Sequence, residues 1–151
     1  MITIYQRIDG RLVRGGPELL TDAALWIDLL SPTPEEERAV EALIGIDVPT
    51  REEMQEIEVS SRLARDGDIL TMTAPVLTNS TGFNPENVAI TFILTNARLI
   101  TVRYGTPQGL AAYIARLERH PVADGAGDLL LGMIESLVDR IADVLEMIAQ
   151  E

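Results

Sequence analysis

The run Val88-Ala-Ile-Thr-Phe-Ile-Leu-Thr95 is apolar on both of the faces that a β-strand presents. A strand of this kind is covered on both sides, so the run predicts a strand at the centre of a sheet. Asn96-Ala97 then forms a turn, and Arg98 to Tyr104 is a second run of strand type. We therefore expect the two segments to pair and to form the middle of the fold.

Further strand-like runs lie on the N-terminal side of this pair. Asp9-Gly10 and Asp66-Gly67 are hairpin turn signals, each between two such runs. The predicted strands are Met1 to Ile8, a short one near Leu12-Val13, Leu25 to Leu30, Ser61 to Arg65 and Asp68 to Leu77. The polar stretch from Asn79 to Pro85 is predicted to be a loop.

Two helices have clear start signals. Thr33 precedes Pro34 and lies three residues before Glu36, which is the pattern of a capping box. Gly45 is expected to end this helix. Thr50 and Glu53 repeat the capping-box spacing at the start of a second, shorter helix.

Two more helices are predicted in the C-terminal third. Thr106-Pro107 opens one, and Pro121 ends it. After a short linker, Asp124 to Gly127, the pattern is helical from Asp128 to the end. Its apolar residues are spaced 4, 3, 4, 3, 4, the heptad pattern of helices that pack lengthwise on other helices: Leu130, Ile134, Leu137, Ile141, Val144 and Ile148. The helix has no stop signal, so we expect the natural chain to continue beyond Glu151, the alternative being a frayed native terminus.

Composition limits the possible functions. The chain has 151 residues, 46% of them hydrophobic, and this is enough for one domain with a core. A net charge of −12 argues against a nucleic-acid partner. The absence of cysteine excludes disulfides, thiol catalysis and cysteine-ligated zinc. No signal peptide and no run of ~18 apolar residues is present, so the chain as given is expected to be soluble.

The sequence marks no enzyme. It lacks a phosphate-binding glycine motif and a Gly-x-Ser-x-Gly elbow. Its one histidine, His120, stands at a helix end, where complementing the helix C-terminus is its ordinary role. A magnesium-dependent enzyme built on carboxylates would need an acidic pair in an apolar setting, and none is apparent.

Two acidic pairs are candidate metal ligands, because Mg²⁺ and Ca²⁺ prefer oxygen donors. Glu52 and Glu53 lie in the first turn of the second helix, and Glu135 and Asp139 are four residues apart on the last one. Three further acidic residues lie near the second pair: Asp128, Asp143 and Glu146. Each pair also has a structural explanation, since Glu53 completes a capping box and the other pair falls on the side expected to face solvent.

Five stretches together resemble the N-terminal region of CorA-type magnesium/cobalt transporters, most closely the proteobacterial branch. They follow one another in the family's order and cover almost the whole chain. They are Ala24 to Glu37 with its Trp-Ile-Asp-Leu segment, Leu43 to Ile46, Pro49 to Arg62, the pair Val88 to Leu94 and Arg98 to Arg103, and Leu129 to Asp139.

The resemblance implies an α/β fold, an α/β/α sandwich with a mixed central sheet, followed by the start of a long C-terminal helix. Residues 1–123 would be a cytoplasmic sensor domain and 124–151 the start of a stalk helix that leads to two membrane spans, absent here. The full protein would be a homopentamer in the bacterial inner membrane. Metal held between subunits would keep its pore closed.

By position in that family, Glu52 and Glu53 match an acidic pair at the sensor site, and Glu135 and Asp139 match a second site. The regulatory ion would be weakly bound Mg²⁺, with Co²⁺ or Ca²⁺ as alternatives at the same positions. The family's Gly-Met-Asn pore motif is absent from the chain. Two other hypotheses stay open: a zinc-transporting relative of the same fold, and a stand-alone soluble module whose last helix pairs with a partner coiled coil.

Overall fold

The computed structural model describes residues 1–78 and 86–151, and its centre is a seven-stranded sheet in the order β2-β1-β3-β7-β6-β5-β4. The strands are β1 (Ile2–Ile8), β2 (Arg11–Gly15), β3 (Ala24–Leu30), β4 (Leu63–Asp66), β5 (Ile69–Thr78), β6 (Glu86–Leu94) and β7 (Leu99–Arg103). The loop predicted from Asn79 to Pro85 lies outside the described residues. All the other strand predictions are confirmed to within about two residues.

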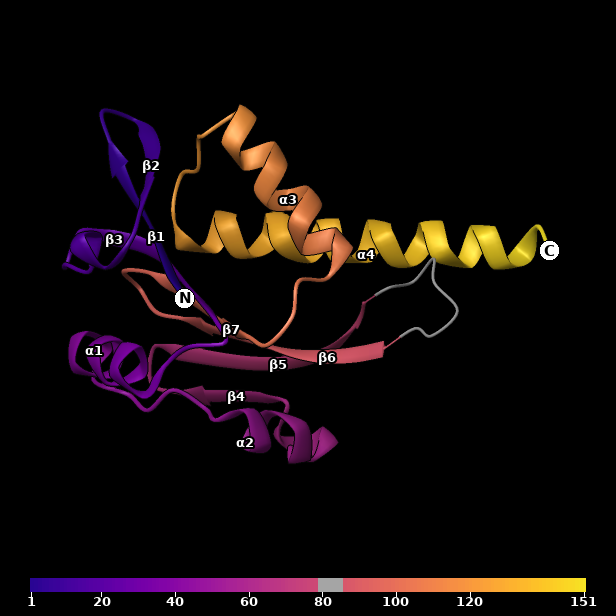
Figure 1. Ribbon diagram of the computed structural model, residues 1–151, viewed down its shortest axis with the longest axis horizontal. Coiled ribbons are helices and arrows are strands. Elements are labelled where there is room, and N and C mark those ends of the chain that lie inside the picture. The colour runs from indigo at the N-terminus through magenta and orange to yellow at the C-terminus, as the bar shows by residue number, and fades with distance from the viewer. Residues whose placement is uncertain (79–85) are drawn as a thin grey trace.

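In the described part of the chain, four helices cover the two faces of this sheet. They are α1 (Pro34–Ile44), α2 (Arg51–Glu56), α3 (Gln108–Arg119) and α4 (Ala126–Ala149), with short 3₁₀ turns at Pro17–Leu19 and Val59–Ser61. Helices α1 and α2 lie on one side of the sheet, and α3 and α4 lie on the other (Figure 1). The expected α/β/α sandwich is therefore confirmed.

The middle of the sheet is the pair predicted from the most apolar stretch. Strands β6 and β7 pair antiparallel through Phe92 and Thr101, while β7 runs parallel to β3 on its other side. All other pairs are antiparallel, so the sheet is mixed. Every residue of β7 is buried, as expected of a strand covered on both faces.

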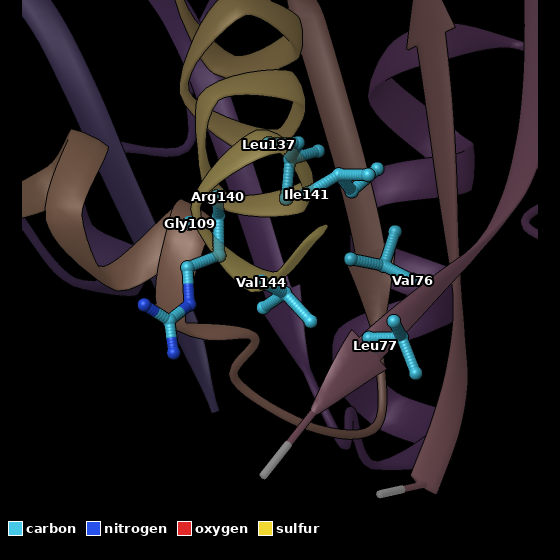
Figure 2. Close-up of a pocket in the computed structure, with 7 residues that line it drawn as sticks. All are labelled: Val76, Leu77, Gly109, Leu137, Arg140, Ile141 and Val144. Atoms are coloured by element: carbon cyan, nitrogen blue, oxygen red, sulfur yellow. The ribbon is translucent and has the colours of Figure 1, made fainter. Parts of the chain in front are cut away.

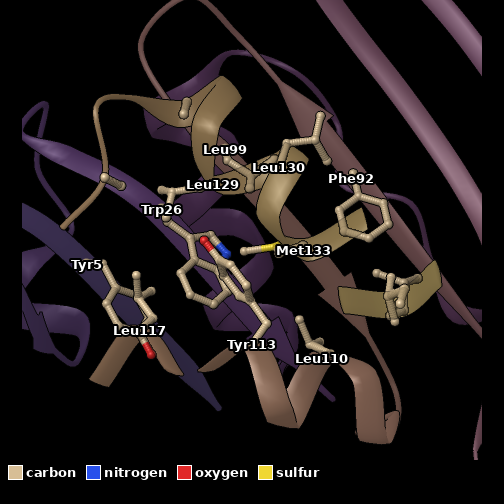
Figure 3. Packing of buried hydrophobic residues seen from close by; sticks show 14 of the residues in the cluster. Tyr5, Trp26, Phe92, Leu99, Leu110, Tyr113, Leu117, Leu129, Leu130 and Met133 are labelled. Atoms are coloured by element: carbon tan, nitrogen blue, oxygen red, sulfur yellow. The ribbon is translucent and has the colours of Figure 1, made fainter. Parts of the chain in front are cut away.

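Two hydrophobic cores fill the space between the layers. The core under α3 and α4 is built around Trp26, which is completely buried and stacks on Tyr5 with ring centres 4.4 Å apart (Figure 3). The ring of Tyr113 from α3 meets the same indole edge-on at 6.4 Å. The core under α1 and α2 is aliphatic and includes Ile27 and Val40, both fully buried.

Local sequence signals set the helix ends on the α1 and α2 side. The Thr33 hydroxyl accepts from the Glu36 N–H at 3.2 Å, and the Glu36 carboxylate accepts from the Thr33 N–H at 2.9 Å. Gly45 ends α1 with φ of 73°, a left-handed conformation that a residue with a Cβ adopts only under strain. Both predicted capping boxes are present.

Helix α3 packs closely on α4 because glycine faces the neighbouring helix on each of them. A Cβ on Gly109 would lie 2.9 Å from the Ser136 carbonyl oxygen, and one on Gly132 would lie 2.6 Å from the Tyr113 ring. The Ser136 hydroxyl donates to the Gly109 carbonyl at 2.7 Å across this contact. A larger side chain at either glycine would push the two helices apart.

Helix α4 differs from its prediction in two ways. It begins at Ala126, so the last two residues of the expected linker are helical. The buried stripe is also shifted from the expected seam, because Leu129 and Met133 are completely buried while Ile141 and Ile148 are 45% and 62% exposed. The first half of the helix contacts the sheet and α3 at once, and these two contacts need a wider apolar arc than a coiled-coil seam.

The proposed domain boundary between residues 123 and 124 falls in the loop between α3 and α4, and it stays a prediction. Within the described residues, no helix is long and apolar enough to span a bilayer.

Candidate metal-binding surfaces

Glu53 is engaged in the cap of α2. Its carboxylate accepts from the Thr50 N–H at 2.8 Å, and its own N–H donates to the Thr50 hydroxyl at 3.2 Å. These bonds from Thr50 lower the pKa of the Glu53 carboxyl. The structural role that the spacing suggested is thus confirmed, although a carboxylate oxygen outside the cap can still face a cation.

Glu52 lies in a cluster that the sequence did not reveal. Burial and the nearby carboxylates of Glu37 and Glu52 raise the pKa of the Tyr104 hydroxyl. Burial and the charge of Glu41 raise the pKa of Glu37, opposed by a hydrogen bond from Tyr104. The Arg51 guanidinium lies 5.4 Å from the centre of the Tyr104 ring. Glu52 of the predicted sensor pair and Glu37 of α1 therefore both act on the Tyr104 hydroxyl.

A small hollow adjoins this cluster. It has a volume of about 130 Å³ and lies between α2 and the start of β6. Arg51, Tyr104 and Glu86 line its polar side, and Met54, Val88 and Ala89 line its apolar side. The hollow is large enough for a hydrated ion, but its lining includes only one carboxylate, Glu86, and also a guanidinium, Arg51.

Glu135 and Asp139 are both exposed on α4, away from its buried stripe. Neither forms an ion pair with any residue of the described part of the chain. Carboxylates four residues apart on a helix repel one another, and a cation between them would remove that repulsion. The structure thus leaves both groups available for a ligand.

The two predicted pairs do not form one site. Helix α2 contributes Met54 to the core on one face of the sheet, whereas α4 contributes Met133 to the core on the other. Figure 1 shows α2 and α4 on opposite sides of the sheet. Among residues 1–78 and 86–151, no three acidic or histidine side chains converge as metal ligands would. Oxygen donors suit Mg²⁺, but each pair supplies only part of a shell, so water or another chain must supply the rest.

Asp28 is the carboxylate that sequence reasoning passed over. It is 3% exposed and accepts two hydrogen bonds from Arg103, at 3.0 and 2.8 Å, and one from the Thr101 hydroxyl at 2.6 Å. The indole N–H of Trp26 in turn donates to Thr101 at 3.0 Å. Arg103 also binds the Gly105 carbonyl and the Thr106 hydroxyl, just before α3. The aspartate of the Trp-Ile-Asp-Leu segment therefore joins β3, β7 and the start of α3, and both of its oxygens accept hydrogen bonds from the protein.

The crevice between β5 and the middle of α4 is also a packing feature. It is lined by Val76, Leu77, Gly109, Leu137, Arg140, Ile141 and Val144, whose apolar side chains point toward one another (Figure 2). Its volume is about 10 Å³, room for roughly one water molecule. It cannot hold an organic ligand.

Comparison with known proteins gives the family. Residues 21–151 match the model of the family described as CorA-like Mg²⁺ transporter protein. The chain belongs to this family. The expected likeness to CorA-type transporters is therefore confirmed over nearly the whole chain.

Curated CorA proteins are similar along the full length of the chain. The magnesium transport protein CorA of Wolinella succinogenes is 31% identical over 163 residues, which cover 100% of this chain and 50% of that protein. CorA of Escherichia coli K12 is 29% identical over 151 residues, which cover 98% of this chain and 48% of that protein. The chain thus spans about half the length of the curated CorA relatives that it matches.

Several solved structures share the fold. The full-length CmaX protein matches with a TM-score of 0.77 at 18% identity, over 99% of this chain and 48% of that one. The complete CorA magnesium transporter from Methanocaldococcus jannaschii matches with a TM-score of 0.70 at 20% identity, over 100% of this chain and 49% of that one. The ZntB cytoplasmic domain from Vibrio parahaemolyticus matches with a TM-score of 0.67 at 16% identity, over 99% of this chain and 62% of that one.

Proposed function

We propose that this chain is the cytoplasmic regulatory region of a CorA-type magnesium/cobalt transporter and not an enzyme. The observation that carries the proposal is the family match over residues 21–151. The whole transporter is a homopentamer in the bacterial inner membrane, and its transport pore is formed by parts of the protein beyond this chain. The relatives, about twice as long, have room for such parts.

The regulatory ligand in this proposal is Mg²⁺, with Co²⁺ or Ca²⁺ able to occupy the same positions. Glu52 and Glu53 contribute at one surface, and Glu135 and Asp139 contribute at the other. Support comes from their exposure and from the incomplete shell that each pair offers within one chain. A carboxylate from a neighbouring subunit would complete the shell, so that bound metal favours the closed assembly.

Thermal unfolding of the chain in MgCl₂ and in NaCl of equal ionic strength tests this sensing role. Ligand that binds only the folded state raises Tm. Magnesium is expected to raise Tm more than sodium does. Glu52→Gln and the double change Glu135→Gln with Asp139→Asn should each reduce the magnesium-specific gain.

Asp9→Asn is the matched control, because it removes one exposed carboxylate at the turn between β1 and β2, which belongs to neither α2 nor α4. Without metal, the α4 double variant should be more stable by about 0.2–0.5 kcal/mol, since it removes an i,i+4 repulsion. Equal Tm shifts in the two salts, or equal losses in Asp9→Asn, would remove the sensing role assigned to these residues.

Similarity to the ZntB cytoplasmic domain favours a second candidate, a zinc transporter of the same fold. Zinc sites use cysteine and histidine, and this chain has no cysteine and one histidine. The same unfolding experiment with ZnCl₂ at micromolar concentration separates the two. A Tm gain from zinc that His120→Gln abolishes would favour the zinc transporter.

A further inference from the structure

An open hollow lies between α3 and α4, close to the point where α3 ends and α4 begins. Its volume is about 290 Å³, more than twice that of the hollow beside α2. Helix α3 contributes Tyr113, Arg116 and His120 to its lining, and α4 contributes Asp128 and Gly132. None of the residues proposed above as metal ligands lines this hollow, so its polar groups are available for a different ligand.

Two nitrogen-bearing side chains of α3 face this hollow without a carboxylate partner. The Arg116 guanidinium lies 5.4 Å from the centre of the Tyr113 ring but forms no ion pair with any described residue. The His120 side chain likewise has no hydrogen bond or ion pair within residues 1–78 and 86–151. The chain has 24 acidic residues, so carboxylates are plentiful, yet none pairs with these two groups. Both can therefore donate hydrogen bonds to an anion.

The α4 side of the hollow carries a hydrogen-bond acceptor, the carboxylate of Asp128. One of its oxygens accepts from the Asp124 N–H at 3.2 Å, and the other has no partner among the described residues. The Tyr113 hydroxyl lies close by, because a Cβ on Gly132, one turn after Asp128, would be 3.3 Å from its oxygen. Burial and, after it, the charge of Asp128 raise the pKa of Tyr113. Donors on α3 and an acceptor on α4 thus surround one space.

This combination of groups distinguishes anions by whether they carry a proton. Guanidinium and imidazole N–H groups donate to the oxygens of any oxyanion, whereas a carboxylate repels an anion that has no proton to donate. Inorganic phosphate keeps a P–OH group at neutral pH and sulfate has none. A phosphate monoester loses its last proton near pH ~6. Donors on one side and a carboxylate acceptor on the other therefore suit inorganic phosphate best.

We propose that the hollow between α3 and α4 binds inorganic phosphate, with Arg116 and His120 donating to its oxygens and Asp128 accepting from its P–OH group. All three side chains are exposed, and the net charge of −12 opposes the approach of an anion. Binding is therefore weak, with Kd on the order of 1 mM. It does not depend on the proposed metal sensing, which uses other residues.

Nuclear magnetic resonance titration of the ¹⁵N-labelled chain with sodium phosphate tests the site, at pH 7, constant ionic strength and without divalent metal. The backbone amide signals at the end of α3 and the start of α4 should shift and reach saturation. Arg116→Gln should weaken binding about tenfold, and His120→Gln should weaken it less. Arg119→Gln is the matched control and should bind like the unaltered chain. It removes the same charge from an exposed position in the same last turn of α3, but it does not line the hollow.

Titration with sulfate tests the role assigned to Asp128. The unaltered chain should bind sulfate about tenfold more weakly than phosphate. Asp128→Asn should remove most of this difference, because an amide does not repel an unprotonated anion. Glycerol 3-phosphate, a monoester, should bind as weakly as sulfate. Far-ultraviolet circular dichroism verifies that each variant is folded.

Three results would overturn the proposal. The first is a set of signal shifts that never saturates, and the second is equal weakening by Arg116→Gln and Arg119→Gln. The third is that the unaltered chain binds sulfate or glycerol 3-phosphate as tightly as it binds phosphate. Because every titration is made without divalent metal, a failure of the proposed metal sensing would leave these results unchanged.

Discussion

The carboxylate of Asp28 and those of Glu52, Glu135 and Asp139 have the same chemistry but opposite surroundings. Asp28 is buried, and three hydrogen bonds from Arg103 and Thr101 occupy both of its oxygens. The other three are exposed and have no ion pair within the described residues. A buried charge requires partners fixed by the fold, whereas an exposed charge keeps water that a cation can replace.

The largest expected effect comes from removing the carboxylate of Asp28 from its buried ion pair with Arg103. Asp28→Ala leaves the Arg103 guanidinium buried without its counter-ion, and we expect a loss of about 3–5 kcal/mol in the free energy of unfolding. Urea unfolding followed by circular dichroism measures it. Asp22→Ala is the control, since this exposed carboxylate lies 3.9 Å from Arg98 and its removal should change little. Equal losses would mean that the interior ion pair contributes no more than a surface one.

Two buried tyrosines extend the comparison of buried with exposed ionisable groups to high pH. Burial raises the pKa of Tyr5 and of Tyr113 to about 12, above the ordinary value of 10. An acid whose pKa is higher in the folded state holds its proton longer when folded. Stability should therefore be complete below pH 10 and should fall as the pH rises from 10 to 12.

Urea unfolding at pH 9, 10 and 11 checks this expectation, with tyrosinate absorbance reporting ionisation. Tyr113→Phe should be less sensitive to alkaline pH than the unaltered chain, whatever its stability at pH 7. A variant with the same pH dependence would show that Tyr113 ionises as freely in the folded chain as in the unfolded one.

The smallest effects concern neighbouring surface carboxylates. Thr50→Ala should cost about 1 kcal/mol through loss of the α2 cap. Glu53→Gln should cost less in the absence of metal. Glu52→Gln, with the same change of charge, should cost less still, because Glu52 takes no part in the cap and contributes only its charge near the helix N-terminus. Thermal unfolding in metal-free buffer compares the three variants. A loss in Glu52→Gln equal to that in Glu53→Gln would show that charge, not capping, governs this helix end.

Local signals predicted most of the fold, because their causes lie within a few residues. Thr33 with Glu36, Thr50 with Glu53 and the Asp66-Gly67 turn each define an element by themselves, and the structure has all three. The layer arrangement followed from the family resemblance and is confirmed.

Features that depend on distant contacts were not predictable from local patterns. The Asp28–Arg103 ion pair joins residues 75 positions apart, and the approach of Glu37 to Tyr104 depends on how α1 lies beside the sheet. The predicted position of the buried stripe on α4 was wrong for a similar reason. The apolar residues of this helix span more than one heptad seam, and contacts with the sheet and α3 determine that Leu129 and Met133 are covered while Ile134 is only partly covered. The predicted metal positions stay predictions.

The parallel pairing of β3 with β7 also has a consequence for the order of synthesis. Trp26 of β3 bonds to Thr101 of β7, 75 residues later in the chain. At a translation rate of ~5–20 residues per second, about 4–15 s pass between the synthesis of β3 and the synthesis of β7. During that interval the edge of β3 is open to pairing with the wrong strand. A nascent chain therefore exposes this edge of β3 until β7 leaves the ribosome.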